Sequence, residues 1–247
     1  MSTITIKRVE TKKDLTRFID FHYTLYKGSP YDAPNLFSDD MRTLSKDKNA
    51  AFEFCEAEYF MAYRDGEMVG RVAAIINNRA NNKWQQKRVR FGWIDFVDDM
   101  DVSKALLDAV AQWGKSKGME EIVGPLGFTD LDPEGLLIQG FDQLGTQATI
   151  YNYDYYQKHF ENDGTWVKDN DYVEYKLYVP EKMPEKYAKV AEMVTKRYNL
   201  HVKKLTRKDV FEGGYGKKIF EVINDTFKDL YGYSELSEKQ IEQYVKM

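Results

Sequence analysis

Hydrophobic and polar residues follow the periods of strands and helices along the first half of the chain. Residues 4–9 alternate as in a short strand, and two helical patterns follow. Residues 58–77 predict a β-hairpin, because Asp65 and Gly66 favour a two-residue turn between two apolar arms. Residues 72–76 are all apolar, which indicates a central strand buried on both faces.

The clearest succession of elements lies between residues 88 and 125. Residues 89–96 predict a strand whose alternation places Val89, Phe91, Trp93 and Asp95 on one face. The next residues carry apolar side chains at helical spacing, with Asp101 as the expected N-cap. A short strand follows at 121–124, and a strand, helix and strand of this length predict a parallel crossover.

Two polar stretches predict loops. Residues 77–87 contain four asparagines and are expected to connect two strands. Residues 125–156 mix glycines, apolar residues and acidic residues. The second stretch is too long for a simple connection, so we expect it to be functional or to cover a site. After it, the pattern predicts a short helix at 155–161 and strands at 166–167 and 172–179.

The last part of the chain resembles the beginning. Residues 206–210 echo residues 11–15, and in both places a short predicted strand precedes them and an aromatic-rich helix follows. The second strand of this repeat is predicted at 202–205. We therefore predict three parts, which are a first domain at 1–179, a connecting helix at 180–199 and the incomplete start of a second, related domain at 200–247.

Composition narrows the function classes. The formal net charge is −4 and basic residues are spread along the chain, which argues against nucleic acid as a partner. Cys55 is the only cysteine, so no intrachain disulfide can form. No stretch has the character of a signal peptide or a membrane span. We expect a cytoplasmic protein with no membrane partner, and the sequence specifies no oligomeric state.

The histidines predict no metal site, because His22, His159 and His201 lack the spacing of metal ligands.

The order of predicted elements over residues 1–179 resembles the GNAT superfamily of acyl-CoA N-acyltransferases, and more narrowly a group of poorly characterised bacterial GNAT-like proteins. Three local features add to the resemblance. They are the Asp-Gly hairpin followed by residues 69–72, the strand-to-helix junction at 96–102, and the segment 155–166. The resemblance implies an α/β (α+β) fold, with a mixed, mostly antiparallel central sheet flanked by helices.

The resemblance also implies a donor site at the strand-to-helix junction. GNAT domains bind the pyrophosphate of acetyl-CoA or another acyl-CoA there, through glycine-rich backbone at a helix N-terminus. This chain has no glycine at that place and has three carboxylates, which favours a helix that caps itself. The residues that correspond to the cofactor site are Phe96, Val97, Asp98, Met100 and Val102.

The resemblance places two catalytic candidates. Asp95 occupies the position of a general base near the fourth strand, and Tyr156 that of a general acid near the last helix. The alternative is structural, with Asp95 bonded to a neighbouring loop and Tyr156 packed with its hydroxyl group in water.

The substrate candidates also have two interpretations. Asp132 and Glu134 are expected to contact a substrate amine or to be solvated loop charges. Tyr151 and Tyr153 are expected to line a cleft or an interface between domains.

The leading hypothesis is an N-acyltransferase-like protein that moves an acyl group, from acyl-CoA, to a small-molecule amine or a peptide. One alternative is a Fem-type aminoacyl transferase with tandem domains, against which the negative net charge counts. The other alternative is a non-catalytic GNAT-like binding module, which the acidic junction favours.

Overall fold

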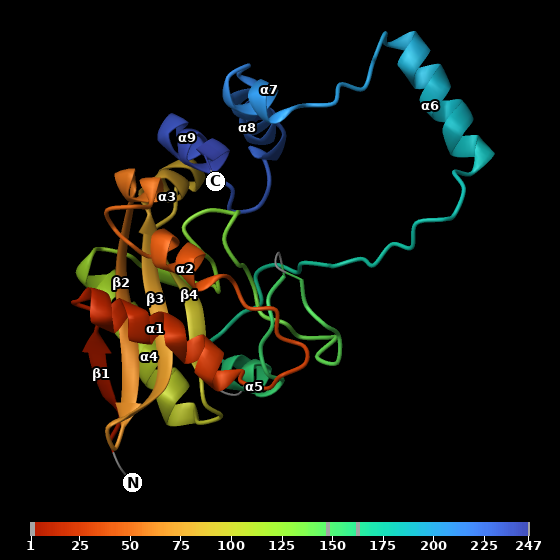
Figure 1. Cartoon of the computed structure of the whole chain (residues 1–247). Coiled ribbons are helices and arrows are strands. Elements are labelled where there is room, and N and C mark those ends of the chain that lie inside the picture. Colours follow the sequence, from red (N-terminus) through yellow and green to blue (C-terminus); the bar gives the residue numbers. More distant parts are fainter. Residues whose placement is uncertain (1–2, 147–148, 162–163, 247) are drawn as a thin grey trace.

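The computed structural model of the chain describes residues 3–146, 149–161 and 164–246 (Figure 1). Its strands form one sheet and are β1 (Thr5–Arg8), β2 (Cys55–Arg64), β3 (Glu67–Asn77), β4 (Arg88–Phe96) and β5 (Glu121–Val123). They lie in the order β1-β2-β3-β4-β5. The first four pair antiparallel, and β4 and β5 are parallel. The predicted hairpin, the parallel crossover and the mostly antiparallel sheet are therefore confirmed.

The helices of the described residues are α1 (Lys12–Leu25), α2 (Phe37–Thr43), the 3-10 turn η1 (Ala50–Glu53), α3 (Asn78–Trp84), α4 (Met100–Ser116), α5 (Tyr155–Glu161), α6 (Glu185–Arg197), α7 (Arg207–Phe211), α8 (Tyr215–Phe227) and α9 (Glu238–Lys246). Helix α1 packs on one face of the sheet, and α4 and α5 pack on the other (Figure 1).

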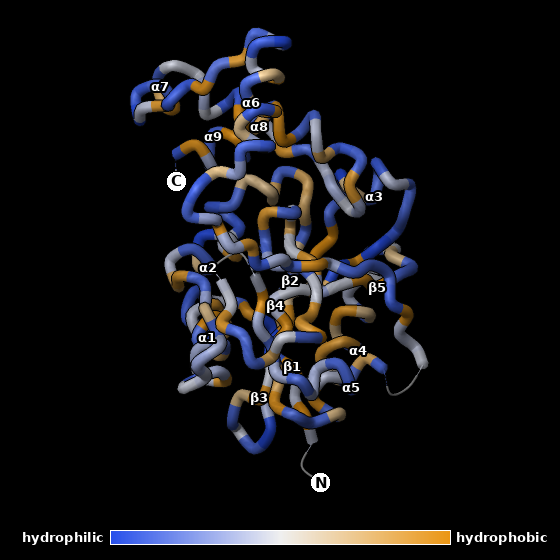
Figure 2. Tube along the Cα trace, turned by 90° about the vertical axis from the view of Figure 1, so that its right-hand side faces the viewer, coloured by the Kyte–Doolittle hydropathy of each residue, from blue (hydrophilic) through white to orange (hydrophobic). Residues whose placement is uncertain are grey.

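Strand β3 joins the two hydrophobic cores. Val72, Ala74 and Ile76 pack in the core under α4. Ala73 and Ile75 pack in the core under α1. Because successive side chains of a strand point to opposite faces, an uninterrupted apolar run supplies both cores at once. Figure 2 shows apolar residues along the strands and along α4. The predicted burial of this strand on both faces is confirmed.

Helix α4 buries the predicted apolar face. Val102, Leu106 and Val110 are fully buried against the sheet. The N-cap, however, is Asp99, whose side chain accepts a hydrogen bond from the backbone N–H of Asp101 at 2.9 Å. The predicted cap at Asp101 is wrong by two residues, because several consecutive carboxylates all suit a helix N-terminus.

Residues 77–87 are mostly helical, so the loop predicted there is wrong. Asn77 begins α3, because its side chain accepts a hydrogen bond from the backbone N–H of Ala80 at 2.8 Å. Ala80 is fully buried. Asparagine is favoured both in loops and at N-caps, so composition alone does not separate the two.

The strands predicted at 166–167, 172–179 and 202–205 are also wrong. None of these residues is in a strand, and the alternating side chains of Leu177 and Val179 are 85% and 91% exposed. Apolar alternation produces a strand only where another strand is available to pair with it. The last strand in the described part of the chain is β5.

The carboxyl-terminal residues pack against α3 and η1, at one end of the sheet. Trp84 Nε1 of α3 donates to the Tyr233 carbonyl at 3.1 Å, and the backbone N–H of Ala50 donates to Gln243 Oε1 at 2.9 Å. Helix α6 has no buried residue and lies apart from the sheet (Figure 1). Among the helices of the described residues, none has the length and apolar character to span a membrane.

One part of the predicted repeat has a local structural likeness. Thr11 and Asp14 form a capping box at α1, and Thr206 and Asp209 form the same box at α7. The division of the chain into domains stays a prediction.

Gly92 of β4 has no room for a side chain. A Cβ atom at this residue would lie 2.5 Å from the carbonyl oxygen of Leu126. We expect Gly92→Ala to lower the free energy of unfolding by about 1–3 kcal/mol, as overpacking does. Chemical denaturation measures this change. The matched control is Gly145→Ala, whose Cβ would meet its nearest neighbour at 3.4 Å. Equal stability of the two variants would contradict the packing described here.

Candidate active site

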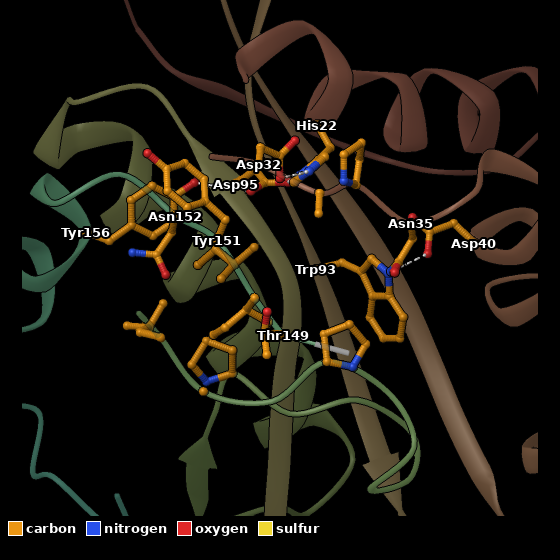
Figure 3. Close-up of a pocket in the computed structure, with 18 of the residues that line it drawn as sticks. His22, Asp32, Asn35, Asp40, Trp93, Asp95, Thr149, Tyr151, Asn152 and Tyr156 are labelled. Carbon is orange, nitrogen blue, oxygen red and sulfur yellow. Dashed lines mark hydrogen bonds and ion pairs between the residues drawn. The ribbon is translucent and has the colours of Figure 1, made fainter. Parts of the chain in front are cut away.

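A pocket opens beside β4 where its partner strand ends (Figure 3). Strand β5 pairs with β4 only at Arg88–Arg90, so the rest of β4 has no strand on that side. Residues of α1, of the connection between α1 and α2, of β3 and β4, of the stretches 125–136 and 149–152, and of α5 line the pocket. Among its lining residues are His22, Asp32, Trp93, Tyr151 and Tyr156.

A β-bulge in β4 shapes this pocket. Gly92 pairs with Ala73 and Asp95 pairs with Arg71, so two residues of β4 lie opposite one residue of β3. Trp93, inside the bulge, has a φ of 44°, a left-handed conformation that is rare for a bulky side chain. Such strain is concentrated at functional sites.

The bulge also changes which face each side chain takes. Val89 and Phe91 pack under α4, whereas Trp93 packs in the core on the α1 side. The prediction that Trp93 and Asp95 share the face of Val89 and Phe91 is therefore wrong. The extra residue shifts the alternation of the strand.

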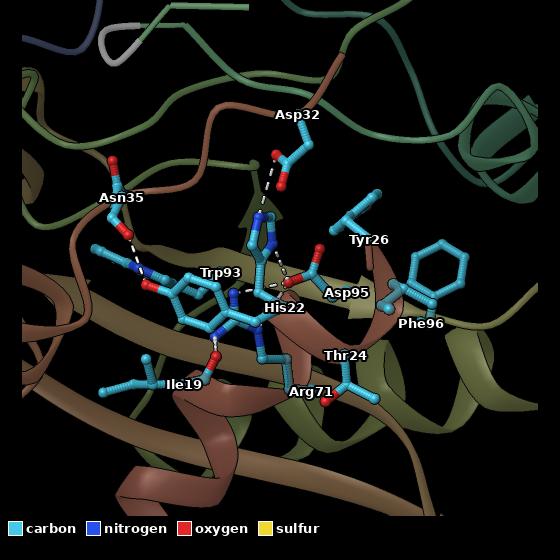
Figure 4. A network of polar contacts seen from close by, with 12 residues as sticks. Ile19, His22, Thr24, Tyr26, Asp32, Asn35, Arg71, Trp93, Asp95 and Phe96 are labelled. Carbon is cyan, nitrogen blue, oxygen red and sulfur yellow. Dashed lines mark hydrogen bonds and ion pairs between the residues drawn. The ribbon is translucent and has the colours of Figure 1, made fainter. Parts of the chain in front are cut away.

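Asp95 is the centre of a buried polar network (Figure 4). Its Oδ2 atom accepts from Arg71 Nε at 2.8 Å and lies 2.7 Å from Arg71 Nη2. The same oxygen lies 3.1 Å from Nδ1 of His22. Burial favours the neutral acid, but the charges of Arg71 and His22 outweigh it and lower the pKa of Asp95 to about 2.

His22 links Asp95 to a second carboxylate. Its Nε2 atom lies 3.3 Å from Oδ1 of Asp32, in the connection between α1 and α2. Burial disfavours the imidazolium, yet the charge of Asp95 and hydrogen bonds to both carboxylates raise the pKa of His22 to about 9. Sequence reasoning missed both residues. Local sequence carries no signal that joins His22 to Asp95, which is far away along the chain.

Tyr156 of α5 closes the network on the other side. Its hydroxyl donates to Asp95 Oδ1 at 3.2 Å and accepts from the Phe96 backbone N–H at 3.2 Å and from the Tyr26 hydroxyl at 2.8 Å. Burial, followed by the charge of Asp95, raises the pKa of Tyr156 well above its usual value, so the hydroxyl keeps its proton. The structure thus brings together the two predicted catalytic candidates, Asp95 and Tyr156.

Comparisons with known proteins give two sequence relatives, while no family model matches the chain. The chain is 33% identical over 153 residues to protein YghO of Escherichia coli strain K12, a match that covers 62% of this chain and 39% of YghO. It is 26% identical over 250 residues to the bacterial ceramide synthase of Caulobacter vibrioides, and this match covers 96% of this chain and 61% of that protein. The chain therefore spans less than two thirds of either relative.

Solved structures of acetyltransferases show distant similarity. The aminoglycoside acetyltransferase AAC(6')-Iy, in complex with a bisubstrate analog, has a TM-score of 0.42 and 20% identity, covering 72% of this chain and 100% of that one. The aminoglycoside acetyltransferase meta-AAC0020, from a soil metagenomic sample, has a TM-score of 0.41 and 12% identity, covering 72% and 97%.

The helices and strands follow one another in the predicted order. Two helices lie between β1 and β2, three antiparallel strand pairs follow, and α4 crosses over to a parallel β5. This is the arrangement that the resemblance implied. The pocket lies where the parallel pairing of β4 and β5 ends, and the bulge of β4 forms one wall of it.

The junction that would hold a pyrophosphate in a GNAT fold is closed in this chain. The backbone N–H groups of Val102 and Ser103 donate to the Asp99 carbonyl, and the Asp99 side chain caps α4 and pairs with Arg64. Asp98 accepts from His159 Nε2 at 3.0 Å. No glycine lies at the junction, so its residues do not fit a pyrophosphate.

The predicted cofactor residues differ in solvent exposure and do not form one common surface. Phe96 and Val102 are fully buried, Val97 is half-buried, and Asp98 and Met100 face solvent.

Of the four predicted substrate residues, one lines the pocket and three do not. Tyr151 lines the pocket. Tyr153 donates its hydroxyl to the Leu25 carbonyl at 3.2 Å and packs against neighbouring tyrosine rings. Asp132 accepts from the backbone N–H groups of Phe128 and Thr129, which stabilises a turn. Asp132 and Glu134 are not among the residues that line the pocket.

In the described ranges, no group of three or more His, Cys, Asp or Glu side chains is arranged to hold a metal ion.

Removing the charge of Asp95 tests this network. Asp95→Asn leaves the Arg71 guanidinium buried without a carboxylate, and we expect the free energy of unfolding to fall by about 3–5 kcal/mol. The matched control is Asp98→Asn. The Asp98 side chain is 68% exposed, so removing its charge should lower the free energy of unfolding by less than about 1 kcal/mol. Thermal or chemical unfolding measures both. A loss at Asp95 no larger than at Asp98 would contradict the buried pairing.

Proposed function

We propose that this chain is part of an N-acyltransferase, which transfers the acyl group of a thioester to an amine. The observation that carries the proposal is the network of Asp95, His22 and Tyr156 at the bulge of β4, on the wall of a pocket. Acyl transfer to an amine needs three things in one place. They are polar groups that stabilise the developing oxyanion, groups that move protons, and a cavity for the acceptor.

The bulge supports the first of these. Trp93 and Ile94 lie between the paired residues Gly92 and Asp95, outside the regular ladder with β3. Backbone groups released from a ladder are available to a bound carbonyl, and fixed dipoles of this kind stabilise an oxyanion without reorganisation. We infer that the thioester carbonyl binds beside the bulge.

Asp95 and Tyr156 then take defined roles. A carboxylate whose pKa is about 2 is a weak proton acceptor, so we propose that Asp95 acts as a fixed negative charge that orients its neighbours. Tyr156 keeps its proton and holds Asp95 from the side opposite Arg71. As a general base, Asp95 would have to take a proton on its carboxylate. Arg71 and His22 stabilise the anionic form of this carboxylate, so the role of general base is disfavoured.

The acceptor proposed is a long-chain amine. The relative from Caulobacter vibrioides is named a ceramide synthase, and a ceramide is the amide of a long-chain amino alcohol. The pocket supports such an acceptor, because the apolar side chains of Leu136, Ile150 and Trp93 line it beside the polar network. A peptide acceptor has no comparable support.

The donor proposed is an acyl thioester that does not depend on a pyrophosphate site at α4. The N–H groups of Asp101, Val102 and Ser103 are bonded to Asp99 at the start of α4, and the carboxylates of this junction would repel a pyrophosphate. A non-catalytic binding module is the second candidate, and the same closed junction favours it. An assay of amide formation separates the two.

The assay compares two donors with one acceptor. Purified protein is mixed with sphinganine and either palmitoyl-CoA or palmitoyl-pantetheine, and amide is measured by mass spectrometry. We expect amide from both donors, with kcat/KM values within roughly tenfold of each other, because the missing nucleotide part has no binding site at α4. Trp93→Ala, which removes a pocket wall, should lower the rate. The control, Trp84→Ala, changes a tryptophan on α3 that does not line the pocket.

Absence of amide with either donor would favour the binding module. Activity with palmitoyl-CoA alone would contradict the proposed independence from the pyrophosphate.

A further inference from the structure

His22 lines the pocket but has not yet been given a chemical role in the proposed acyl transfer. Its side chain is 19% exposed, so it is accessible from the pocket while being largely enclosed. It lies near the end of α1, and the Arg71 guanidinium donates to the carbonyls of Phe18 and Ile19 in the same helix at 2.8 and 3.4 Å. Arg71 also binds Asp95, so one side chain fixes both the helix and the carboxylate that the ring contacts (Figure 4).

The contacts of the ring define its protonation state. Nδ1 faces Asp95 at 3.1 Å and Nε2 faces Asp32 at 3.3 Å. A carboxylate only accepts hydrogen bonds, so both ring nitrogens must donate, and a histidine with two N–H groups is an imidazolium.

The charges around the ring agree with this state. Asp32 and Asp95 contribute two negative charges and Arg71 one positive charge, so the imidazolium makes the group neutral. The other titratable groups of the pocket and of the ring's neighbours are the hydroxyls of Tyr23, Tyr26, Tyr151 and Tyr156 and the carboxyl of Asp40. The pKa of that carboxyl is raised by burial, while nearby charges and hydrogen bonds counteract the rise.

We propose that His22 is the proton-transfer residue of the acyl transfer, with Asp32 as the group that receives the acceptor amine. This inference rests on the proposed function. Asp95 and Arg71 act as positioning residues, because they hold the ring from the side away from Asp32.

The proposed steps balance without a further reactant. The uncharged amine, held by Asp32, attacks the thioester carbonyl and forms the carbon–nitrogen bond. The tetrahedral intermediate collapses, the carbon–sulfur bond breaks, and the Nε2 proton of the imidazolium goes to the departing sulfur. The neutral imidazole then takes the extra proton from the new amide nitrogen. The products are an amide and a thiol, and His22 returns to the imidazolium.

The geometry explains why Nε2 is the atom that exchanges its proton. Asp95 is held by Arg71 and Tyr156, so the bond to Nδ1 is fixed. Asp32 makes the longer contact and lies in a connection between helices rather than in the sheet. An amine that binds Asp32 would therefore loosen the Nε2 contact and leave the Nδ1 contact in place.

The test is the pH profile of kcat and of kcat/KM for sphinganine acylation. For the native protein we expect kcat/KM to fall as pH rises through about 9, where the imidazolium of the free enzyme loses its proton. His22→Gln keeps a hydrogen-bonding side chain but cannot exchange a proton. We expect it to lower kcat by roughly 100-fold, with a much smaller change in KM, and to remove the alkaline fall. The control is His201→Gln, which changes an exposed histidine and should leave the profile unchanged.

A His22→Gln variant with the native kcat, or with the alkaline fall intact, would overturn the proposal for His22 while the acyltransferase activity stands. No amide from the native protein with any donor would overturn both.

A second variant keeps the test valid if His22→Gln does not fold. Asp32→Asn removes one of the two carboxylates that stabilise the imidazolium, so the alkaline fall should move to lower pH. An unmoved fall in this variant would also overturn the proposal.

Discussion

The buried ion pair of Arg71 and Asp95 is the interaction on which the rest of this structure depends. Two opposite charges lie in the interior, with side chains 4% and 7% exposed. Burying either charge without its partner would cost roughly several kcal/mol, so each charge is stable in the interior only because the other is present. The pair also joins three elements, because Arg71 of β3 binds the carbonyls of α1 and Asp95 of β4. The charge state of the pocket and the position of α1 thus have one common cause.

The bulge of β4 decides what this pair can do. Without the extra residue, Asp95 would point toward α4 and the apolar core beneath it, as the alternation of the strand predicts. The bulge turns it toward α1, where His22 meets it. The self-capped start of α4 has the opposite effect, because it closes a surface that a GNAT fold can use for phosphate. Polar chemistry in this chain is therefore concentrated at the pocket beside the bulge.

Much of the fold could be predicted from local sequence. The apolar run of β3 and the helical face of α4 follow from periodicity, and the resemblance paired Asp95 with Tyr156. The missed features depend on distant contacts or on context. His22 meets Asp95 only when α1 packs against β4, and the connection after α1 brings Asp32 to the other nitrogen of the same ring. Residues 172–179 alternate as a strand would, but they have no partner strand, so their pattern has no structural effect. The asparagine-rich stretch at the end of β3 forms a capped helix rather than a loop, since the buried Asn77 caps α3.

The most direct test of the account is the protonation state of the His22 ring, followed by nitrogen NMR from acid to alkaline pH and assigned by comparison with His22→Gln. The account predicts that both ring nitrogens carry a proton at neutral pH and that the ring titrates near pH 9. It also predicts that Asp95→Asn lowers the midpoint, because the carboxylate is the main attraction for the imidazolium. A ring that titrates near its ordinary value of 6.5, with one nitrogen unprotonated above it, would contradict the charged cluster at the centre of this structure.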